Sequence, residues 1–444
     1  MTTVIGERPA PPATYGPPRD ATGDVLDWRD EQSIARRLVE RFALIAFGLY
    51  HLPLFLNNYP SLGGGGVNDS GLAIKWGHVF TPVGVWVARL VFHMNGPMPA
   101  ASGGDNGDVG EEFGRLLASV VIAVIGAVCW TIADRKRPAA RWTGEALRVL
   151  LRYSIALGIA SYAIAKILPV QFPPLTTAAY ETRLGDLTPM SLLWSFMEYS
   201  RPYAFFGGLM ELTAVLLLCF RRTATLGAAV CLAVMTNVAL MNLAYGVPVK
   251  LYALMVAVSA AALLVYEAPR LVRVFVTNQP APAARLSSAL DRIPLAARWT
   301  IKVLLVGSVI LSSAVTMVPA ARARAWVASP LDGAWVVTSF ARNGVPLDST
   351  GNPARWRRVV IDAFTVGVRF ETDTVVRCRR TSTATTLSLL CVRNHRGELT
   401  WTRTGDVLRV EGTFDGAPIV ALAKYVDPSN YPLVRSKFRW IFDR

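Results

Sequence analysis

Long apolar runs constrain this chain more than any other feature of its sequence. A helix needs about 20 predominantly apolar residues to cross the hydrocarbon core of a bilayer, and several runs approach or reach that length. They fall at about 43–56, 113–133, 149–168, 203–220, 224–245, 251–266 and 299–319. Hydrophobic residues make up 52% of the chain and charged residues only 17%, which is typical of a membrane protein. We therefore predict a helical membrane domain of about seven spans.

The basic residues between these runs predict how the chain lies in the membrane. Arginine-rich segments are 1–42, 134–148, 221–222 and 267–298, and segments poor in basic residues are 57–112, 169–202 and 246–249. The two kinds alternate through all seven runs, and basic loops stay on the cytoplasmic side. This predicts a cytoplasmic N-terminus and places everything after residue 320 outside the cytoplasm. Because the basic residues behind the net charge of +15 sit in these loops and in the domain after residue 320 rather than on one basic face, the bilayer is the predicted partner and nucleic acid is not.

Composition divides the chain into five parts. Residues 1–33 are rich in Pro, Gly, Asp and Arg and lack an apolar core, so we expect a disordered cytoplasmic tail rather than a signal peptide. The parts that follow are a helical membrane domain at 34–275, a cytoplasmic linker at 276–298, the seventh transmembrane helix at 299–320 and a second domain at 321–444. Within the membrane domain, 76–94 is apolar but interrupted by two histidines, a proline and an arginine. We expect a re-entrant or interfacial helix there rather than a span.

The second domain alternates apolar and polar residues in eight short segments. They are 335–340, 356–361, 366–370, 375–379, 387–392, 399–401, 407–410 and 419–422, with turn signals such as Gly405-Asp406 and Asp415-Gly416 between them. Alternation with period two and regular turns predicts an antiparallel β-barrel or sandwich. An eight-stranded barrel has either a filled core or room for one small ligand. In the second case Trp335, Val337 and Phe370 would line the cavity.

Two cysteines in this domain are placed for a crosslink. Cys378 and Cys391 are symmetric about the turn at 384–385, so they would oppose each other across a hairpin. In an oxidising compartment this favours a disulfide, and the alternative is two separate thiols, one on each strand. The other cysteines lie in apolar runs without a partner motif. The five cysteines and four histidines have no zinc-type spacing, so no metal site is predicted.

Polar residues inside apolar runs point to a membrane site, because ionisable groups in lipid are costly and usually face a protein interior. The candidates are Lys166, Gln171, Glu211, Asn237, Asn242, Lys250 and His51. The predicted orientation puts Lys166, Glu211, Asn242 and Lys250 in the outer half of the membrane, and Asn237 near its middle. One interpretation is an outward-facing pocket for an anionic or carbonyl-bearing ligand. The other is that the lysines extend to lipid head groups, Glu211 fixes helix packing and His51 is a hydrogen-bonded packing residue.

Several runs resemble DoxX-like bacterial membrane proteins over most of 35–275. They are Arg41-Phe42 with Tyr50-His51-Leu52-Pro53, then Lys166-Ile-Leu-Pro169-Val-Gln171-Phe172, Leu187-Thr-Pro189-Met190, Phe206-Gly207 with Glu211, and Asn242-Leu-Ala-Tyr245-Gly246-Val-Pro248-Val-Lys250. Where the family often has aspartate before Val-Pro-Val-Lys, this chain has Gly246, so an acidic partner for Lys250 is missing from that motif. In the second domain, Gly333-Ala-Trp335 resembles the opening strand of lipocalin-like barrels. Arg355-Trp356-Arg357 and Phe438-Arg439-Trp440-Ile441 resemble long DoxX-like proteins with such a tail.

The resemblance implies a place in the bacterial cytoplasmic (inner) membrane and, for some relatives, quinone-linked oxidation of sulfur compounds. It therefore suggests a redox-linked component that handles a quinone or a sulfur compound at the outward-facing pocket. The alternative is a non-enzymatic protein that binds or transfers a lipid or small apolar ligand between bilayer and barrel. The sequence has no haem, iron–sulfur or flavin motif and no visible catalytic triad, which weighs against autonomous electron transfer. Whether the chain is an enzyme stays open.

Overall fold

The computed structural model describes residues 34–57, 72–94, 108–135, 142–281, 293–323, 329–348, 351–363, 365–383, 385–392 and 395–436. The predicted disordered tail at 1–33, part of the linker and the closing run at 438–441 lie outside the described residues. The chain divides into two compact units, which we describe separately. The helical unit contains the described residues up to Ser161 with Met210–Leu243 and Pro248–Ser312, and the barrel unit contains Tyr162–Leu209, Ala244–Val247 and Ser313–Arg444.

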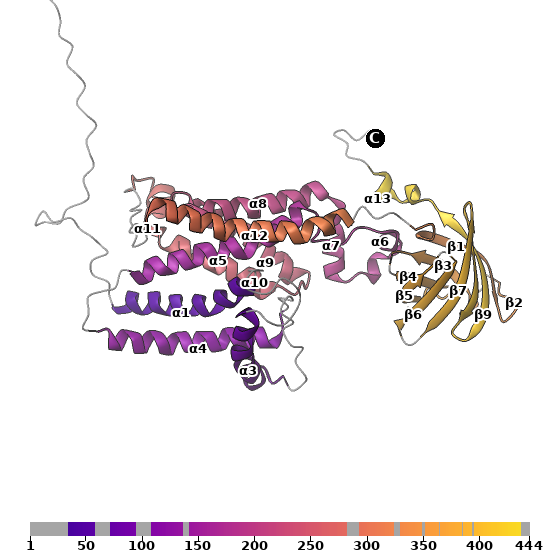
Figure 1. Ribbon diagram of the computed structural model, residues 1–444, viewed down its shortest axis with the longest axis horizontal. Coiled ribbons are helices and arrows are strands. Elements are labelled where there is room, and N and C mark those ends of the chain that lie inside the picture. The colour runs from indigo at the N-terminus through magenta and orange to yellow at the C-terminus, as the bar shows by residue number, and fades with distance from the viewer. Residues whose placement is uncertain are drawn as a thin grey trace, which may run out of the picture. The chain divides into compact units, whose positions relative to one another are not determined.

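The helical unit is a bundle whose helices run largely along one another (Figure 1). Its elements are α1 (Ile34–Asn57), α3 (Leu72–Phe92), α4 (Gly110–Ala133), the first part of α5 (Trp142–Ile167), the later part of α8 (Arg201–Cys219), α9 (Ala224–Ala244), α10 (Lys250–Val265), α11 (Ala268–Leu271), the π-helix η2 (Val272–Val276) and the first part of α12 (Leu295–Ala323). The predicted apolar runs therefore fall on helices.

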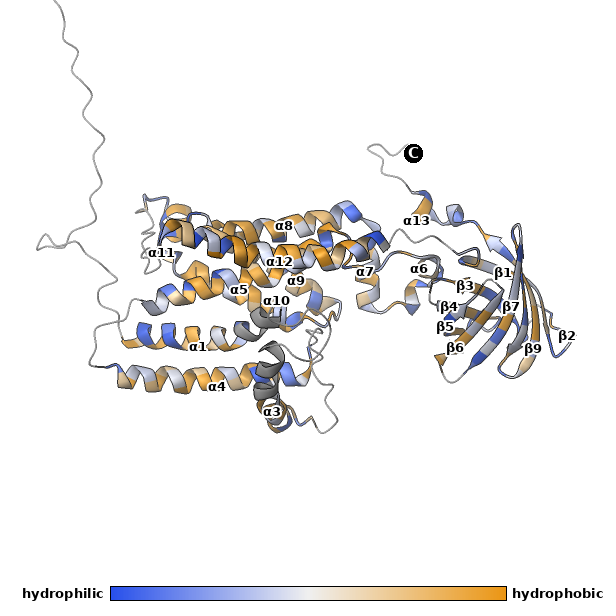
Figure 2. Cartoon of the chain, in the orientation of Figure 1, coloured by the Kyte–Doolittle hydropathy of each residue, from blue (hydrophilic) through white to orange (hydrophobic). Residues whose placement is uncertain are grey.

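Five helices among the described residues are long and apolar enough to cross a membrane, namely α4, α5, α8, α9 and α12. A sixth crossing forms if α10 and the α11–η2 segment act as one span, which would bend by 69° at the break. Apolar residues predominate in the middle of α4, α8 and α12 (Figure 2). These helices are compatible with a membrane protein. The predicted run at 43–56 lies in α1, whose first two turns carry three arginines and a glutamate, so a count of seven spans stays a prediction.

Helix α4 illustrates how the bundle is packed. Its buried positions include the small residues Gly114, Ala118, Ala123 and Ala127, whereas large apolar residues such as Ile125 face outward. Membrane helices associate through small residues that let backbones approach closely, because lipid already solvates large apolar side chains. At Gly114 the approach is closest, since a Cβ there would lie 2.0 Å from the backbone oxygen of Gly84 in α3. The α3–α4 contact therefore requires glycine.

The predicted re-entrant or interfacial segment at 76–94 lies in α3. Figure 1 shows α3 running across α1 and α4 rather than along them. The part of α3 whose side chains are described, Thr81–Phe92, is shorter than a full span. Thr81 donates a hydrogen bond to Glu111 Oε1 at 2.6 Å, which fixes α3 to the first turn of α4. Helix α3 is therefore attached to the bundle, although it runs across α1 and α4.

The barrel unit combines short helices with a sheet. Its helices are the end of α5, α6 (Thr177–Glu181), the 3-10 helix η1 (Leu184–Asp186), α7 (Pro189–Tyr199) and the start of α8. The strands are β1 (Gly333–Arg342), β2 (Val345–Pro346), β3 (Trp356–Ile361), β4 (Thr365–Phe370), β5 (Val375–Ser382), β6 (Thr386–Cys391), β7 (Arg396–Thr404), β8 (Val407–Phe414) and β9 (Ala417–Val426), followed by η5 (Pro428–Asn430) and α13 (Pro432–Arg435). All eight predicted strand segments are confirmed.

The sheet closes into an antiparallel barrel of eight strands. The order is β1-β3-β4-β5-β6-β7-β8-β9, and β9 pairs back with β1, while the two-residue β2 pairs with the end of β1. Closure removes the open edges that a flat sheet would expose. The barrel that alternation predicted as one of two architectures is therefore the observed one, and a sandwich is excluded for the described strands.

Side chains fill the barrel interior. The largest buried ones are Trp335, Trp356, Phe340 and Phe414, which contact one another or neighbouring rings at centroid distances of 5.1–5.4 Å. Aliphatic residues from every long strand complete this core. Of the two predicted interiors, the structure therefore has the filled core, and Trp335 and Val337 pack within it rather than lining a cavity.

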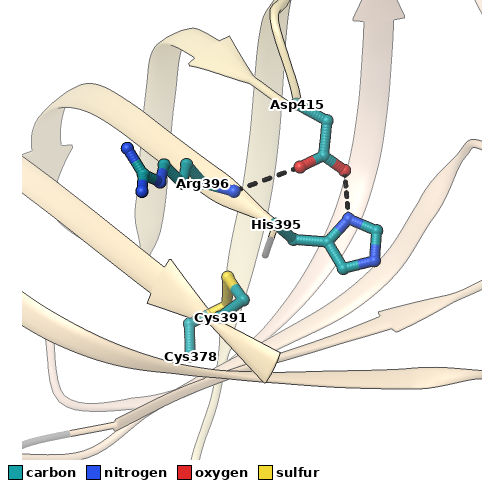
Figure 3. The surroundings of a disulfide bond; sticks show 5 residues. All are labelled: Cys378, Cys391, His395, Arg396 and Asp415. Atoms are coloured by element: carbon teal, nitrogen blue, oxygen red, sulfur yellow. Dashed lines mark hydrogen bonds and ion pairs between the residues drawn. A yellow bond between two sulfur atoms is a disulfide. The ribbon is translucent and has the colours of Figure 1, made fainter. Parts of the chain in front are cut away.

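One end of the barrel is held by two crosslinks (Figure 3). Cys378 on β5 and Cys391 on β6 lie directly opposite each other and form a disulfide, the pairing that the hairpin symmetry favoured. Beside it, His395 Nδ1 lies 2.6 Å from Asp415 Oδ2, and the Arg396 N–H donates to Asp415 Oδ1 at 3.2 Å. The second crosslink joins the start of β7 to the β8–β9 turn.

Candidate functional site

A pocket of about 240 Å³ opens at the end of α5 in the barrel unit. It is lined by Lys166, Ile167, Pro169, Arg201, Pro202 and Phe205. Lys166 is buried on the last turn of α5, and Arg201 is exposed at the first residue of α8. The pocket therefore combines two cations with apolar walls, which suits a ligand that has a polar head and an apolar body.

Close helix packing positions Lys166. A Cβ at Gly208 would lie 2.8 Å from Lys166 Cβ and 2.8 Å from the Ala163 oxygen. Helix α8 therefore approaches α5 so closely that only glycine fits at position 208. The backbone N–H groups of Val170 and Gln171 both donate to the Ala165 oxygen, at 2.8 and 3.1 Å, and end α5 just beyond the lysine. These contacts leave little freedom for the base of the Lys166 side chain.

Arg201 and Phe205 complete the pocket from α8. Arg201 Nη2 lies 3.5 Å from Oε1 of Glu198, a buried residue of α7. Phe205 follows one turn after Arg201 on the same helix face. Neither was selected from the sequence. The signal that could have found them is the Arg201-Pro202 pair at the start of an apolar run, because proline at the first turn fixes where the helix and its first side chains begin.

A second cluster lies in the helical unit around the start of α10. Lys250 Nζ lies 3.1 Å from Asp108 Oδ2, and the backbone N–H groups of Lys250 and Leu251 donate to Asp108, each at 2.9 Å. Asn242 is buried on α9, and its Nδ2 donates to the Val249 oxygen at 3.3 Å. Asp108 thus supplies both a helix cap and the acidic partner that the Gly246 motif lacks. Sequence analysis missed it because it stands 142 residues before Lys250.

His51 is buried in the helical unit, where its Nε2 lies 2.9 Å from Ser259 Oγ on α10. Its ring also stacks against Phe47 and meets Tyr50 edge-on. These are the surroundings of a hydrogen-bonded packing histidine. Of the two interpretations of His51 left open by the sequence, the structure supports packing.

The remaining predicted residues lie in different surroundings. Glu211 is buried on α8, and its pairing with lysines stays a prediction. Gln171 is half-buried, and its buried Oε1 has no hydrogen-bond donor among the described residues. Asn237 lies on an exposed face of α9. The expectation that Asn237 faces a protein interior is therefore wrong for the described residues, whereas its depth in the membrane stays a prediction. Helix α9 is exposed on the face that carries it, and its buried face carries Met235 and Ala239 instead.

The four barrel candidates have structural surroundings. Gly333 has φ +142°, and a Cβ there would lie 2.5 Å from the Tyr425 ring, so only glycine fits. Trp335 donates its ring N–H to the Leu331 oxygen at 2.9 Å. Arg355 is buried, with guanidinium nitrogens that donate to three backbone oxygens and to Glu371. Trp356 is buried in the core. These residues close and fill the barrel.

Helix α6 docks on the barrel within the barrel unit. The Glu181 carboxylate binds Arg358 of β3 and the hydroxyl of Tyr431. Thr176 donates to Asp362 at 2.9 Å, and Arg183 pairs with Asp373 at 2.6 Å. Burial raises the pKa of Asp362, whereas a hydrogen bond from Arg183 lowers the pKa of Asp373. The segment from Thr176 to Arg183 is therefore fixed to the barrel wall.

The described residues contain no group of three or more histidine, cysteine or acidic side chains placed to hold a metal ion. Cys129, Cys219 and Cys231 are free thiols, and the last two are buried. The chemistry that the site residues offer is therefore that of hydrogen-bond donors and charges.

Comparison with known proteins gives one relative and no function. The chain is similar to the uncharacterized protein YwoB of Bacillus subtilis (strain 168), with 29% identity over 116 residues, which is 26% of this chain and 71% of that protein. No family model matches the sequence, and no solved structure matches it. The resemblance to DoxX-like proteins and to lipocalin-like barrels therefore stays a prediction.

Proposed function

We propose that this is a membrane protein that binds the polar head of a quinone or of a sulfur compound in the pocket formed by Lys166, Arg201 and Phe205. The observation that carries the proposal is that the buried Lys166 lines a pocket with apolar walls. The proposal does not depend on whether the chain is itself an enzyme.

The pocket chemistry fits quinone-type ligands. A quinone carbonyl accepts hydrogen bonds, and its reduced forms carry negative charge on the same oxygens, so Lys166 and Arg201 would favour them. Phe205, Ile167 and the two prolines provide the apolar surface that a ring needs. A volume of about 240 Å³ holds a head group, while an isoprenoid tail would stay in the lipid. A sulfur oxyanion would use the cations alone, without the apolar walls.

The predicted orientation puts this pocket at the outer side of the membrane, next to the segment that docks on the barrel. A redox-linked role would then place head-group binding outside the cytoplasm. The alternative function, transfer of a lipid or apolar ligand between bilayer and barrel, needs an open interior. The aromatic core that fills the barrel counts against it.

Ligand binding by the purified full-length protein tests the proposal. We expect decylubiquinone and menadione to bind, and we expect Arg201→Gln and Lys166→Met each to weaken binding by about tenfold or more, the effect of losing one hydrogen bond to a charged group. Arg89→Gln, at an exposed position on α3, is the matched control and should bind as the wild type does.

Sulfite and thiosulfate form the second arm of the experiment. If they bind and the quinones do not, the pocket serves a sulfur oxyanion instead. If none of these compounds binds, or if both pocket variants bind as the control does, the proposed function is wrong. Arg201 is exposed, so its variant tests the pocket even if Lys166→Met does not fold.

A further inference from the structure

Four cations gather at one end of the helical unit, and none of them lines the pocket just described. Arg152 lies on α5, Arg221 in the turn between α8 and α9, and Arg298 and Lys302 on the first turns of α12. In Figure 1 the C-terminal end of α8 and the start of α12 lie at the same end of the bundle as α11. The distribution of basic loops predicts that this end faces the cytoplasm.

Arg152 is the centre of this basic cluster. The residue is only 8% exposed, and its Nε donates to the Leu218 oxygen at 2.9 Å. That oxygen is among the last carbonyls of α8, which have no partner within the helix. Arg152 Nη2 is also buried, and it has no hydrogen-bond acceptor among the described residues. A buried guanidinium donor without an acceptor is costly.

Other cations act electrostatically on Arg152 and Lys302. Arg148 and Arg221 act electrostatically on Arg152, and Arg152, Arg221 and Arg298 act on Lys302. The other groups that act on these two cations are Tyr153 and Cys219, so no carboxylate is among their described electrostatic partners. Neighbouring cations in a partly dry site repel one another, and a bound anion offsets that repulsion. The arrangement therefore attracts a negative group.

An aromatic wall borders the cluster. Lys302 Nζ lies 5.8 Å from the Phe220 ring centroid and 5.3 Å from that of Trp299, and the two rings are 5.8 Å apart. Phe220 is 42% and Trp299 47% exposed. Half-exposed aromatic residues beside basic ones are typical of the boundary between head groups and acyl chains.

We propose that this basic cluster binds the phosphate group of an anionic phospholipid, with Arg152 Nη2 as its innermost donor. Arginine forks suit phosphate oxygens, and basic pockets between helices at the cytoplasmic face hold anionic head groups. Free phosphate has the same anion chemistry, but it would leave the Phe220–Trp299 surface unused. The aromatic wall is the reason to assign the site to a lipid.

A purely structural role for Arg152 makes a different prediction. As a cap on the C-terminal carbonyls of α8 it would stabilise the fold equally in every lipid. A lipid site instead makes stability depend on the head group that is present.

The experiment compares three probes on the full-length protein purified in detergent. They are phosphatidylglycerol, phosphatidylcholine and inorganic phosphate, followed by native mass spectrometry and thermal unfolding. We expect phosphatidylglycerol to remain bound and to raise the melting temperature clearly more than the other two. Equal effects of the two lipids would overturn the proposal, and an effect of inorganic phosphate as large as that of phosphatidylglycerol would assign the site to the free anion.

Single substitutions test whether the preference for phosphatidylglycerol comes from the basic cluster. Arg221→Gln and Lys302→Gln should each reduce the preference for phosphatidylglycerol over phosphatidylcholine by about fivefold, the contribution of one cation near an anionic surface. Arg152→Gln should reduce it further, and the first two variants decide the outcome if this one does not fold. Arg273→Gln, exposed in η2, is the matched control. If the cluster variants keep the preference, or if Arg273→Gln loses it equally, the binding is non-specific and the proposal is wrong.

Discussion

Arg355 in the barrel and Arg41 and Lys250 in the helical unit find their carboxylate partners at different separations along the chain. In the barrel, Arg355 pairs with Glu371, which is 16 residues away, and the two are joined across neighbouring turns. In the helical unit, Arg41 pairs with Asp134 over 93 residues, and Lys250 pairs with Asp108 over 142. Arg152 differs from both, because its described electrostatic partners include no carboxylate. A buried cation whose described partners include no carboxylate is a candidate binding site for an anionic ligand. A cation that is paired with a carboxylate of the same chain stabilises the fold instead.

Substitution of Arg355 tests this contrast, and we expect it to have the largest effect on stability. Arg355→Leu removes a guanidinium that is only 6% exposed and leaves Glu371 half-buried without its cation. Breaking a buried pair costs about 3–5 kcal/mol. We expect the barrel to unfold at correspondingly lower denaturant concentration, measured by tryptophan fluorescence.

Two further variants control this result. Arg357→Leu removes an exposed arginine from β3, two residues after Arg355, and should change little. The double variant Arg355→Leu/Glu371→Leu should recover part of the loss, because no unpaired charge remains. If Arg355→Leu matches Arg357→Leu in stability, the barrel does not depend on completed charge pairs.

An intermediate effect is expected at Asp108. Asp108→Ala removes the cap on α10 and the partner of Lys250, which should destabilise the helical unit by about 1–3 kcal/mol. Asp108→Asn keeps a capping oxygen and loses only the charge, so it should cost less. Thermal unfolding of the full-length protein in detergent measures both. Equal losses in the two variants would mean that the charge, and not the cap, accounts for the contact.

The smallest effect concerns pH at the α6 docking segment. The pKa of Asp373 is lowered by Arg183, so its contribution is present above the ordinary value of about 4 and is lost as pH falls through the lowered one. The pKa of Asp362 is raised by burial, so its protonation on acidification favours the folded state. On acidification the backbone amides of Thr177–Glu181 should lose protection against hydrogen exchange. We expect this loss to be smaller in Arg183→Gln than in the wild type. A wild-type pH profile in that variant would contradict this assignment.

The barrel could be predicted from the sequence because its information is local. Strand periodicity and turn residues located all eight long strands, and the position of Cys378 relative to Cys391 followed from the hairpin between them. The sequence could not decide whether the interior is filled, because this depends on which large side chains meet. Trp356 and Phe414 are in contact, but they come from strands that alternation alone cannot place together.

The helical unit was predictable in outline only. Hydropathy located the helices, since length and apolar composition are local, and it placed Lys166 and Lys250 at helix ends. It could not find Asp108, which acts through a tertiary contact from a loop. It also misjudged Asn237, because all faces of an apolar helix look alike until its neighbours are known.

Closure of the barrel through β1 and β9 sets an order of events during synthesis. The pairing runs from Ala334–Val426 to Arg342–Ile419, so the seam joins strands from opposite ends of the domain sequence. Pairing over so many residues is slower than formation of a hairpin. In the predicted orientation the domain must cross the membrane before it folds, and β1 emerges long before β9. The β5–β6 hairpin can form its disulfide early, while the seam forms last and leaves two strand edges open to chaperones or to aggregation until then.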